Sequence, residues 1–258
     1  MDRFAGKTVI VTGAGRGIGQ AIAQRFADEG AEVMLLGRGR EALEETSELI
    51  GGGLVHTADV GDAAQVAAAV GSALDAWGRI DVLVNNAGID DETPFLEIDE
   101  GRWRAVVDTN LTGVFLCSQR VAREMAAAGG GVILHNASID ASGGDGSFAS
   151  YNAAKAGLLG LNRTMALELA EHGIRSNCVS PGFTHTLMTE RAVGPKLMEY
   201  LNGQFARVPL RRLVKPEEIA AAFAFLASDD AAAITGTNLT VDGGLTANWF
   251  ILETLPEG

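Results

Sequence analysis

The chain has 258 residues, of which 47% are hydrophobic and 21% are charged, so it is long enough to bury a full hydrophobic core. Its 33 Asp and Glu residues outnumber its 20 Lys and Arg residues and give a net charge of −13. This charge argues against nucleic acid or an anionic membrane as a partner, because either would need a basic face on the protein.

The sequence also bears on compartment and metal binding. It contains no apolar stretch of transmembrane length, and its N-terminus lacks the apolar core of a signal peptide, so we expect a cytoplasmic protein. Cys117 and Cys178 lack the spacing of metal ligands, and we expect them to be reduced, buried thiols in a protein without a metal site. No linker-like segment divides the chain, so residues 1–258 are predicted to form a single domain.

The first predicted element is a strand followed by a glycine-rich turn. Residues 8–11 are apolar and β-branched, which is typical of a strand that is buried on both faces. The turn TGAGRGIG follows at 12–19, and a helical pattern begins near residue 21. Glycines let the backbone approach a pyrophosphate closely, and a helix N-terminus supplies unpaired N–H groups. The pattern therefore favours a dinucleotide-binding turn over a purely structural one.

Strands and helices alternate along the rest of the chain. Further strands are predicted at 32–36, 54–56, 81–84, 132–136, 175–179 and 238–241. Helices are predicted between them, including a long one at 99–128 and one that begins at Pro216. This alternation predicts a doubly wound α/β domain with a parallel sheet covered on both faces. Residues 187–213 are helical but irregular, and we expect them to form a small substrate lobe over the pocket.

Tyr151 and Lys155 are predicted to lie one turn apart on the same helix face. A cation beside a phenol favours the phenolate, which lowers the tyrosine pKa from its ordinary value of about 10 toward the range useful in acid–base catalysis. The same spacing also occurs by chance on helices, so the pair by itself does not establish a catalytic role.

Together, the motifs resemble those of the classical short-chain dehydrogenase/reductase family. They follow one another in the family's order and at its spacing: TGAGRGIG at 12–19, NNAG at 85–88, Asn110, Ser138, YNAAK at 151–155, PG at 181–182 and DGG at 242–244. The resemblance implies a Rossmann fold with a seven-stranded parallel sheet. It also implies hydride transfer between a nicotinamide and an alcohol or carbonyl carbon.

The resemblance implies a catalytic tetrad of Asn110, Ser138, Tyr151 and Lys155. Tyr151 would exchange a proton with the substrate oxygen, and Lys155 would lower the tyrosine pKa and bind the nicotinamide ribose. Ser138 would donate a hydrogen bond to the substrate oxygen. Asn110 would hold a water in a proton relay. Two plainer alternatives stay open, in which Ser138 caps backbone at a strand end and Asn110 is a helix-surface amide.

The resemblance further implies a cofactor site. Besides Tyr151 and Lys155, the matching residues are Gly13, Arg16, Gly17, Ile18, Gly19, Arg38, Asp59, Val60, Asn86, Ala87, Gly88, Pro181, Gly182, Thr184 and Thr186. The second strand ends at Gly37 without the carboxylate that selects NAD, and Arg38 and Arg16 are cations suited to a 2′-phosphate. NADP is therefore favoured over NAD. In the alternative interpretation, both arginines are solvated loop residues.

Carboxylates are expected at the mouth of the pocket, at Asp90, Asp91, Glu92, Asp140 and Asp145. Such a cluster repels an acidic substrate or an acyl carrier protein. Asp140 could accept hydrogen bonds from a substrate hydroxyl, and with Ser138 and Tyr151 it makes up the predicted substrate site. We expect a small neutral or hydroxylated secondary alcohol or ketone as substrate.

Two other functions stay open. One is a 3-oxoacyl-(acyl-carrier-protein) reductase-like activity, and the other is a nucleotide-binding regulator without catalysis. The resemblance also suggests a homotetramer packed through the tyrosine-bearing helix, the helix before it and the last helix and strand. The apolar residues 248–252 are expected to cover a neighbouring subunit or the pocket.

Overall fold

The computed structural model describes residues 2–247, apart from the side chains at 187, 188 and 191–193. The predicted covering segment 248–252 lies outside the described residues. A seven-stranded sheet runs through the described part in the order β3-β2-β1-β4-β5-β6-β7, and all its neighbouring strands are parallel. The strands are β1 (Thr8–Thr12), β2 (Glu32–Gly37), β3 (Leu54–Thr57), β4 (Val82–Asn85), β5 (Gly131–Asn136), β6 (Ile174–Pro181) and β7 (Asn238–Val241). The predicted doubly wound fold is confirmed.

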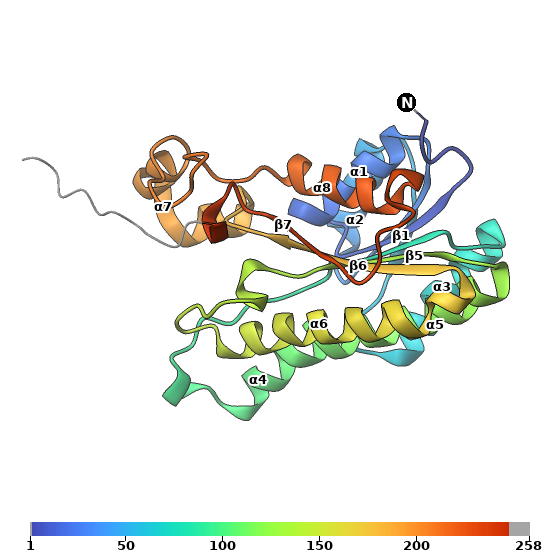
Figure 1. Ribbon diagram of the computed structural model, residues 1–258, viewed down its shortest axis with the longest axis horizontal. Coiled ribbons are helices and arrows are strands. Elements are labelled where there is room, and N and C mark those ends of the chain that lie inside the picture. The colour runs from blue at the N-terminus through green and yellow to red at the C-terminus, as the bar shows by residue number, and fades with distance from the viewer. Residues whose placement is uncertain (1, 248–258) are drawn as a thin grey trace, which may run out of the picture.

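Helices cover both faces of the sheet, with α1, α2 and α8 on one face and α3, α5 and α6 on the other (Figure 1). The helices are α1 (Gly17–Asp28), α2 (Arg40–Leu49), α3 (Ala63–Trp77), α4 (Glu100–Val107), α5 (Gly113–Ala128), α6 (Ala149–Glu168), α7 (Leu187–Leu201) and α8 (Pro216–Ala227). Within residues 2–247, none of the helices combines the length and the apolar character needed to cross a membrane.

Each helical layer closes its own apolar cluster against the sheet. One cluster joins Phe26 of α1 to Phe223 of α8, and the other joins Val70 of α3, Val121 of α5 and Met165 of α6. Successive strand side chains point alternately into the two clusters, so a central strand must be apolar at every position. This burial on both faces explains the continuous apolar run of β1.

The strand order reverses between β1 and β4, because β1 leads outward to β2 whereas β4 leads to β5 on the other side. In open parallel sheets, ligands bind in the crevice outside the carboxyl ends of the strands at such a switch point. The turns after β1, β4, β5 and β6, which carry most of the motifs found in the sequence, all begin at this edge of the sheet.

The predicted lobe at 187–213 is helical and irregular in the structure. It begins with α7, which is kinked at Gly194, where φ is +66°, just before Pro195. Its inner side is a small apolar cluster of its own that includes Leu201, Phe205 and Leu213. α7 lies at one end of the molecule, beyond the sheet (Figure 1).

Candidate active site

The glycine turn between β1 and α1 is tied to the end of β4. Asn86 Nδ2 donates to the main-chain oxygens of Thr12 and Gly13, at 3.0 and 3.2 Å. Thr12 Oγ1 in turn accepts from the N–H groups of Asn86 and Ala87, both at 2.9 Å. A Cβ at Gly19 would lie 2.1 Å from the Gly13 oxygen, so glycine is required there. The role of Thr12 was missed in the sequence, although a hydroxyl at the end of a strand, just before a glycine turn, was its signal.

The N-terminus of α1 fits a phosphate group. Arg16 occupies the N-cap position without making a capping hydrogen bond, and the first turn contains no acidic residue. Unpaired N–H groups and the positive end of the helix dipole therefore face the turn, as a pyrophosphate requires. Gly17, at φ +57°, lies beside Thr186, since a Cβ there would be 3.7 Å from Thr186 Cγ2. The fold thus brings two distant parts of the predicted cofactor site together.

A hollow of about 390 Å³ lies at the predicted adenosine end. It is lined by Arg38, Asp59, Gly61, Asp62, Gln65, Ile89, Ala105, Asp108 and Thr109. Arg38 Nη1 lies 3.9 Å from Asp59 Oδ2, and the two side chains are 65% and 42% exposed, so this ion pair is weak. Val60 is buried against Gly113, where a Cβ would lie 2.8 Å from Val60 Cγ2. Val60 therefore lies behind the lining of this hollow, whereas Arg38 and Asp59 are accessible in it.

Lys155 is anchored to the end of β5. It is only 4% exposed, and its Nζ donates to the main-chain oxygen of Asn136 at 2.6 Å and lies 5.4 Å from the centroid of the Tyr151 ring. Asn136 Nδ2 donates to Asn86 Oδ1 at 2.9 Å, so hydrogen bonds link the glycine turn to Lys155. Asn136 Oδ1 is buried without a partner among residues 2–247, which leaves an acceptor for a ligand. Asn136 was missed in the sequence; a polar residue ending a buried strand was the available signal.

The protein's own groups raise the pKa of Tyr151 instead of lowering it. Burial raises that pKa to about 12, a hydrogen bond with Ser138 opposes the rise, and the charges of Asp140 and Asp90 add to it. Burial also lowers the pKa of Lys155 to about 8. The expected lowering of the tyrosine pKa by Lys155 is therefore wrong for the protein groups alone, because desolvation penalises both charged forms and the carboxylates oppose the phenolate. At pH 7 Tyr151 carries its proton.

Ser138 and Asp140 form a local hydrogen-bonded pair just after β5. Ser138 Oγ accepts from the Asp140 N–H at 3.2 Å, so Ser138 caps backbone after β5, and its role toward a substrate stays a prediction. The same hydroxyl donates to Asp140 Oδ2 at 3.0 Å. Burial raises the pKa of Asp140; the bond from Ser138 lowers it, and the charge of Asp145 raises it further.

Asn110 lies in a π-helical turn, Asp108–Thr112, that interrupts the long helix between α4 and α5. Its side chain is 0% exposed, so the alternative of a surface amide is wrong. Asn110 Nδ2 donates to the Ile89 oxygen at 2.8 Å, and its Oδ1 accepts from the Ile89 N–H at 2.9 Å. These two hydrogen bonds hold the Asn110 side chain against the segment that follows β4. π-helical turns are frequent at functional sites.

The turn after β6 packs against the DGG motif after β7. A Cβ at Gly182 would lie 2.7 Å from Asp242 Cβ, so the turn tolerates no side chain. Thr184 Oγ1 donates to the Gly182 oxygen at 2.9 Å, and Thr186 caps α7 by accepting from the Thr189 N–H at 3.3 Å. Both threonines therefore also hold the local backbone in place.

The carboxylates predicted at the mouth of the pocket (Asp90, Asp91, Glu92, Asp140 and Asp145), here called the acidic rim, do not all act in the same way. Asp91 forms an ion pair with Arg102 at 2.9 Å and accepts from Thr93 Oγ1 at 2.8 Å, so its charge is compensated. The charges of Asp90 and Asp140, by contrast, act on the Tyr151 phenol.

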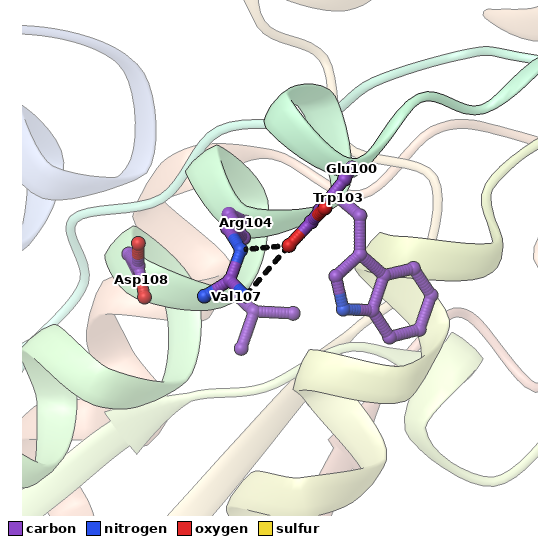
Figure 2. A pocket seen from close by; sticks show the side chains of 5 residues that line it. All are labelled: Glu100, Trp103, Arg104, Val107 and Asp108. Atoms are coloured by element: carbon purple, nitrogen blue, oxygen red, sulfur yellow. Dashed lines mark hydrogen bonds and ion pairs between the residues drawn. The ribbon is translucent and has the colours of Figure 1, made fainter.

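A second hollow, of about 350 Å³, is formed by α4 and the start of the π-helical turn (Figure 2). Its lining comprises Glu100, Trp103, Arg104, Val107 and Asp108, with Arg104 paired to Glu100 at 2.7 Å. It contains none of the predicted catalytic side chains, and Trp103 is 38% exposed there. This hollow is therefore a feature of the outer helix surface.

Known proteins match the chain over nearly its whole length. A family model described as Enoyl-(Acyl carrier protein) reductase matches residues 13–246. A 3-oxoacyl-[acyl-carrier-protein] reductase of Synechocystis sp. is 39% identical, over 95% of this chain and 99% of the relative. A cis-4-hydroxycyclohexanecarboxylate dehydrogenase of Sinomonas cyclohexanicum is 41% identical, over 95% and 99%.

Two further matches are a second dehydrogenase and a solved structure. A meso-2,3-butanediol dehydrogenase of Serratia marcescens is 39% identical, over 95% of this chain and 97% of the relative. A crystal structure from Sinorhizobium meliloti 1021, described as a short-chain alcohol dehydrogenase, superposes with a TM-score of 0.89 at 38% identity. The superposition covers 95% of this chain and 98% of that one.

Proposed function

The chain belongs to the short-chain dehydrogenase/reductase family and is an oxidoreductase that acts on CH–OH groups, and we propose that its substrate is a small neutral or hydroxylated secondary alcohol or ketone. The observation that carries the proposal is the position of Tyr151 and Lys155, which lie beside Ser138 at the same sheet edge as the glycine turn. When bound, the nicotinamide supplies or accepts the hydride.

The chain's own residues supply the proton chemistry. Tyr151 is protonated at pH 7, so it can donate its proton to the oxygen of a ketone as that oxygen becomes negative. Lys155 is fixed by the Asn136 carbonyl where it can hydrogen-bond the nicotinamide ribose. We propose that Asn110, whose side chain is fixed by two hydrogen bonds to Ile89, holds the relay water.

Absorbance of the reduced nicotinamide tests this assignment. The wild type should oxidise or reduce members of a panel of diols, hydroxyketones and simple ketones, and Tyr151→Phe should lose at least about a hundredfold in turnover, as expected for a general acid–base residue. Cofactor binding by both proteins, with no turnover in the wild type, would instead support the nucleotide-binding regulator.

The acidic rim supports an uncharged substrate. Asp90 and Asp140 place negative charge near the phenol, and Asp145 adds charge near Asp140, which raises the cost of bringing in an anion. One oxygen of Asp140 accepts from Ser138, and we propose that the other accepts from a substrate hydroxyl next to the reacting carbon. This favours a diol or hydroxyketone over the 3-oxoacyl thioester that the first relative's name implies.

A substrate comparison separates these two functions. We expect a higher kcat/KM for acetoin than for acetoacetyl-coenzyme A. Turnover of the thioester alone would establish the acyl-carrier-protein reductase alternative.

We propose NADP as the preferred cofactor. Arg38 is exposed beside the adenosine hollow and only weakly paired with Asp59, so it is free to meet a 2′-phosphate. Arg16 lies at the N-terminus of α1 as a second cation. Arg38→Asp should lower the ratio of NADP to NAD efficiency by at least about tenfold, since it replaces an attractive charge with a repulsive one. Arg104→Asp, on the outer surface of α4, is the control for the change in net charge, and an unchanged ratio in Arg38→Asp would reject the assignment.

We further propose a homotetramer. Trp103 on α4 and Phe115 on α5 are 38% and 42% exposed, and a second copy would bury them. Large exposed aromatic side chains are typical of protein interfaces. Light scattering should give four times the chain mass of 26.9 kDa, and a monomer would exclude this assembly.

A further inference from the structure

The hydrogen bonds of Ser138 leave its hydroxyl with few remaining possibilities. A serine hydroxyl has one hydrogen and two lone pairs. The N–H of Asp140 occupies one lone pair at 3.2 Å, and the hydrogen points to Asp140 Oδ2 at 3.0 Å. One lone pair is left for Tyr151 and a substrate. While the carboxylate is ionised, Ser138 can therefore accept a hydrogen bond from the substrate but has no hydrogen to donate to a carbonyl oxygen.

We propose that Asp140 is a positioning residue whose proton decides whether Ser138 donates to the substrate oxygen or accepts from it. When the carboxyl group is protonated, its O–H donates to Ser138 Oγ, and the Ser138 hydrogen is released toward a carbonyl oxygen. When the group is ionised, Ser138 keeps its hydrogen toward Asp140 and accepts from an alcohol O–H. The inference rests on the proposed function, because it needs a substrate oxygen beside Ser138.

The groups around Asp140 raise its pKa above the ordinary value of a carboxyl group. Burial and the charge of Asp145 favour the protonated carboxyl, whereas the bond from Ser138 and the charge of Lys155 favour the ionised one. The net result is a raised pKa for Asp140. Tyr151 on α6 and Cys178 on β6 remain neutral there, since burial raises both of their pKa values to about 12.

Kinetics across pH test the proposal. In Asp140→Asn, the amide can donate to Ser138 Oγ at every pH, and so it mimics the protonated carboxyl. We expect wild-type kcat/KM for acetoin reduction to fall as pH rises through the titration of Asp140. The variant should stay active at the high-pH end, with a gain of about tenfold over the wild type, the factor that one hydrogen bond contributes.

A control variant separates proton direction from charge. Asp145→Asn removes one negative charge near Asp140 without touching Ser138, so the wild-type profile should keep its shape and shift to lower pH. Superimposable pH profiles for the wild type and Asp140→Asn would overturn the proposal.

A second measurement needs no turnover. The chain has two tyrosines, so Tyr200→Phe leaves Tyr151 as the only phenol whose ionisation can be followed by absorbance. Rapid pH-jump titration of the holoenzyme then gives the Tyr151 pKa before alkaline unfolding.

The comparison is made with and without the serine hydroxyl. Asp140→Asn should lower the Tyr151 pKa in both backgrounds through the lost charge. Asp140→Asn should lower the Tyr151 pKa more when Ser138 is present than in Ser138→Ala, because the released Ser138 hydrogen also stabilises the phenolate. Equal shifts in the two backgrounds would reject the role of Ser138 even if no ketone turns over. A larger shift with Ser138, accompanied by no turnover, would uphold the switch and reject only the proposed substrate.

Discussion

His135 should make the protein lose stability in mild acid. It lies on β5 directly before Asn136, it is 0% exposed, and its Nε2 lies 3.2 Å from Ser176 Oγ while its Nδ1 lies 3.2 Å from Asn85 Nδ2. The amide nitrogen of Asn85 is a donor, so Nδ1 accepts and the neutral ring carries its proton on Nε2. Burial, and then the charge of Lys155, lowers the pKa of His135 from 6.5 to about 3.

The magnitude follows from proton linkage. Between the lowered folded pKa and the ordinary unfolded value of 6.5, the unfolded chain binds one proton that the folded protein does not. Stability is therefore complete above about pH 6.5 and falls as the pH decreases. At pH 5, about 1.5 units below the unfolded pKa and at about 1.36 kcal/mol per unit, the loss is about 2 kcal/mol. This figure is the same for any folded pKa well below 5.

Urea unfolding at pH 7 and pH 5 measures the effect, at a fixed protein concentration because assembly contributes to stability. His135→Gln replaces the ring with an amide that cannot titrate. Whatever packing energy the variant loses is the same at both pH values, so it cancels in the difference. The wild type should lose about 2 kcal/mol more than this variant between pH 7 and pH 5. His172→Gln, in which an exposed histidine is changed, should follow the wild type.

Equal losses in the wild type and His135→Gln would show that His135 is not held neutral. If the variant fails to fold, the proton resonances of the four histidine rings in the wild type decide the question. One ring should show no titration between pH 5 and pH 7, and a full titration of all four would refute the reasoning.

Four other substitutions test packing and hydrogen bonding, two of them at the site and two elsewhere in the fold. Gly19→Ala would place a Cβ 2.1 Å from the Gly13 oxygen, so the KM for the cofactor should rise by at least about tenfold. At Gly71 on α3 a Cβ meets open space, so Gly71→Ala should raise the free energy of unfolding in urea by about 1 kcal/mol. Arg175→Met removes hydrogen bonds to main-chain oxygens at the end of α8 and should cost about 3 kcal/mol, seen as a lower urea midpoint at an unchanged slope. Asn136→Val breaks the link from Asn86 to the lysine anchor and should raise cofactor KM about tenfold, and an unchanged KM would refute this positioning role.

The sequence predicted what depends on local pattern. Three patterns are each set by neighbours along the chain. They are the apolar runs of strands buried on both faces, the helical period after the glycine turn, and the four-residue spacing of Tyr151 and Lys155. These patterns gave the parallel sheet, the order of its elements and the edge at which the site lies. The irregular helical character of residues 187–213 was also predictable, because their pattern is helical without a clean strand.

Features that depend on distant neighbours were not predictable in this way. Asp91 was expected to contribute charge to the rim, but Arg102 on α4 neutralises it. A surface amide was one of the two predictions for Asn110, but the π-helical turn buries its side chain against Ile89. Neither partner follows from local spacing, because each comes from a separate element brought close by packing.

The sequence by itself determined the fold class, and it predicted the phosphate turn and the acid–base pair, because these are properties of residue type and periodicity. Only the tertiary structure decided the electrostatics of that pair. Whether Tyr151 is easier or harder to ionise depends on how deeply the folded chain buries it and on which carboxylates face it. Here burial, with the charges of Asp140 and Asp90, outweighs the hydrogen bond with Ser138 and raises the Tyr151 pKa. The direction of the Ser138 proton is decided in the same way, by the conformation that places Asp140 Oδ2 within 3.0 Å of the hydroxyl.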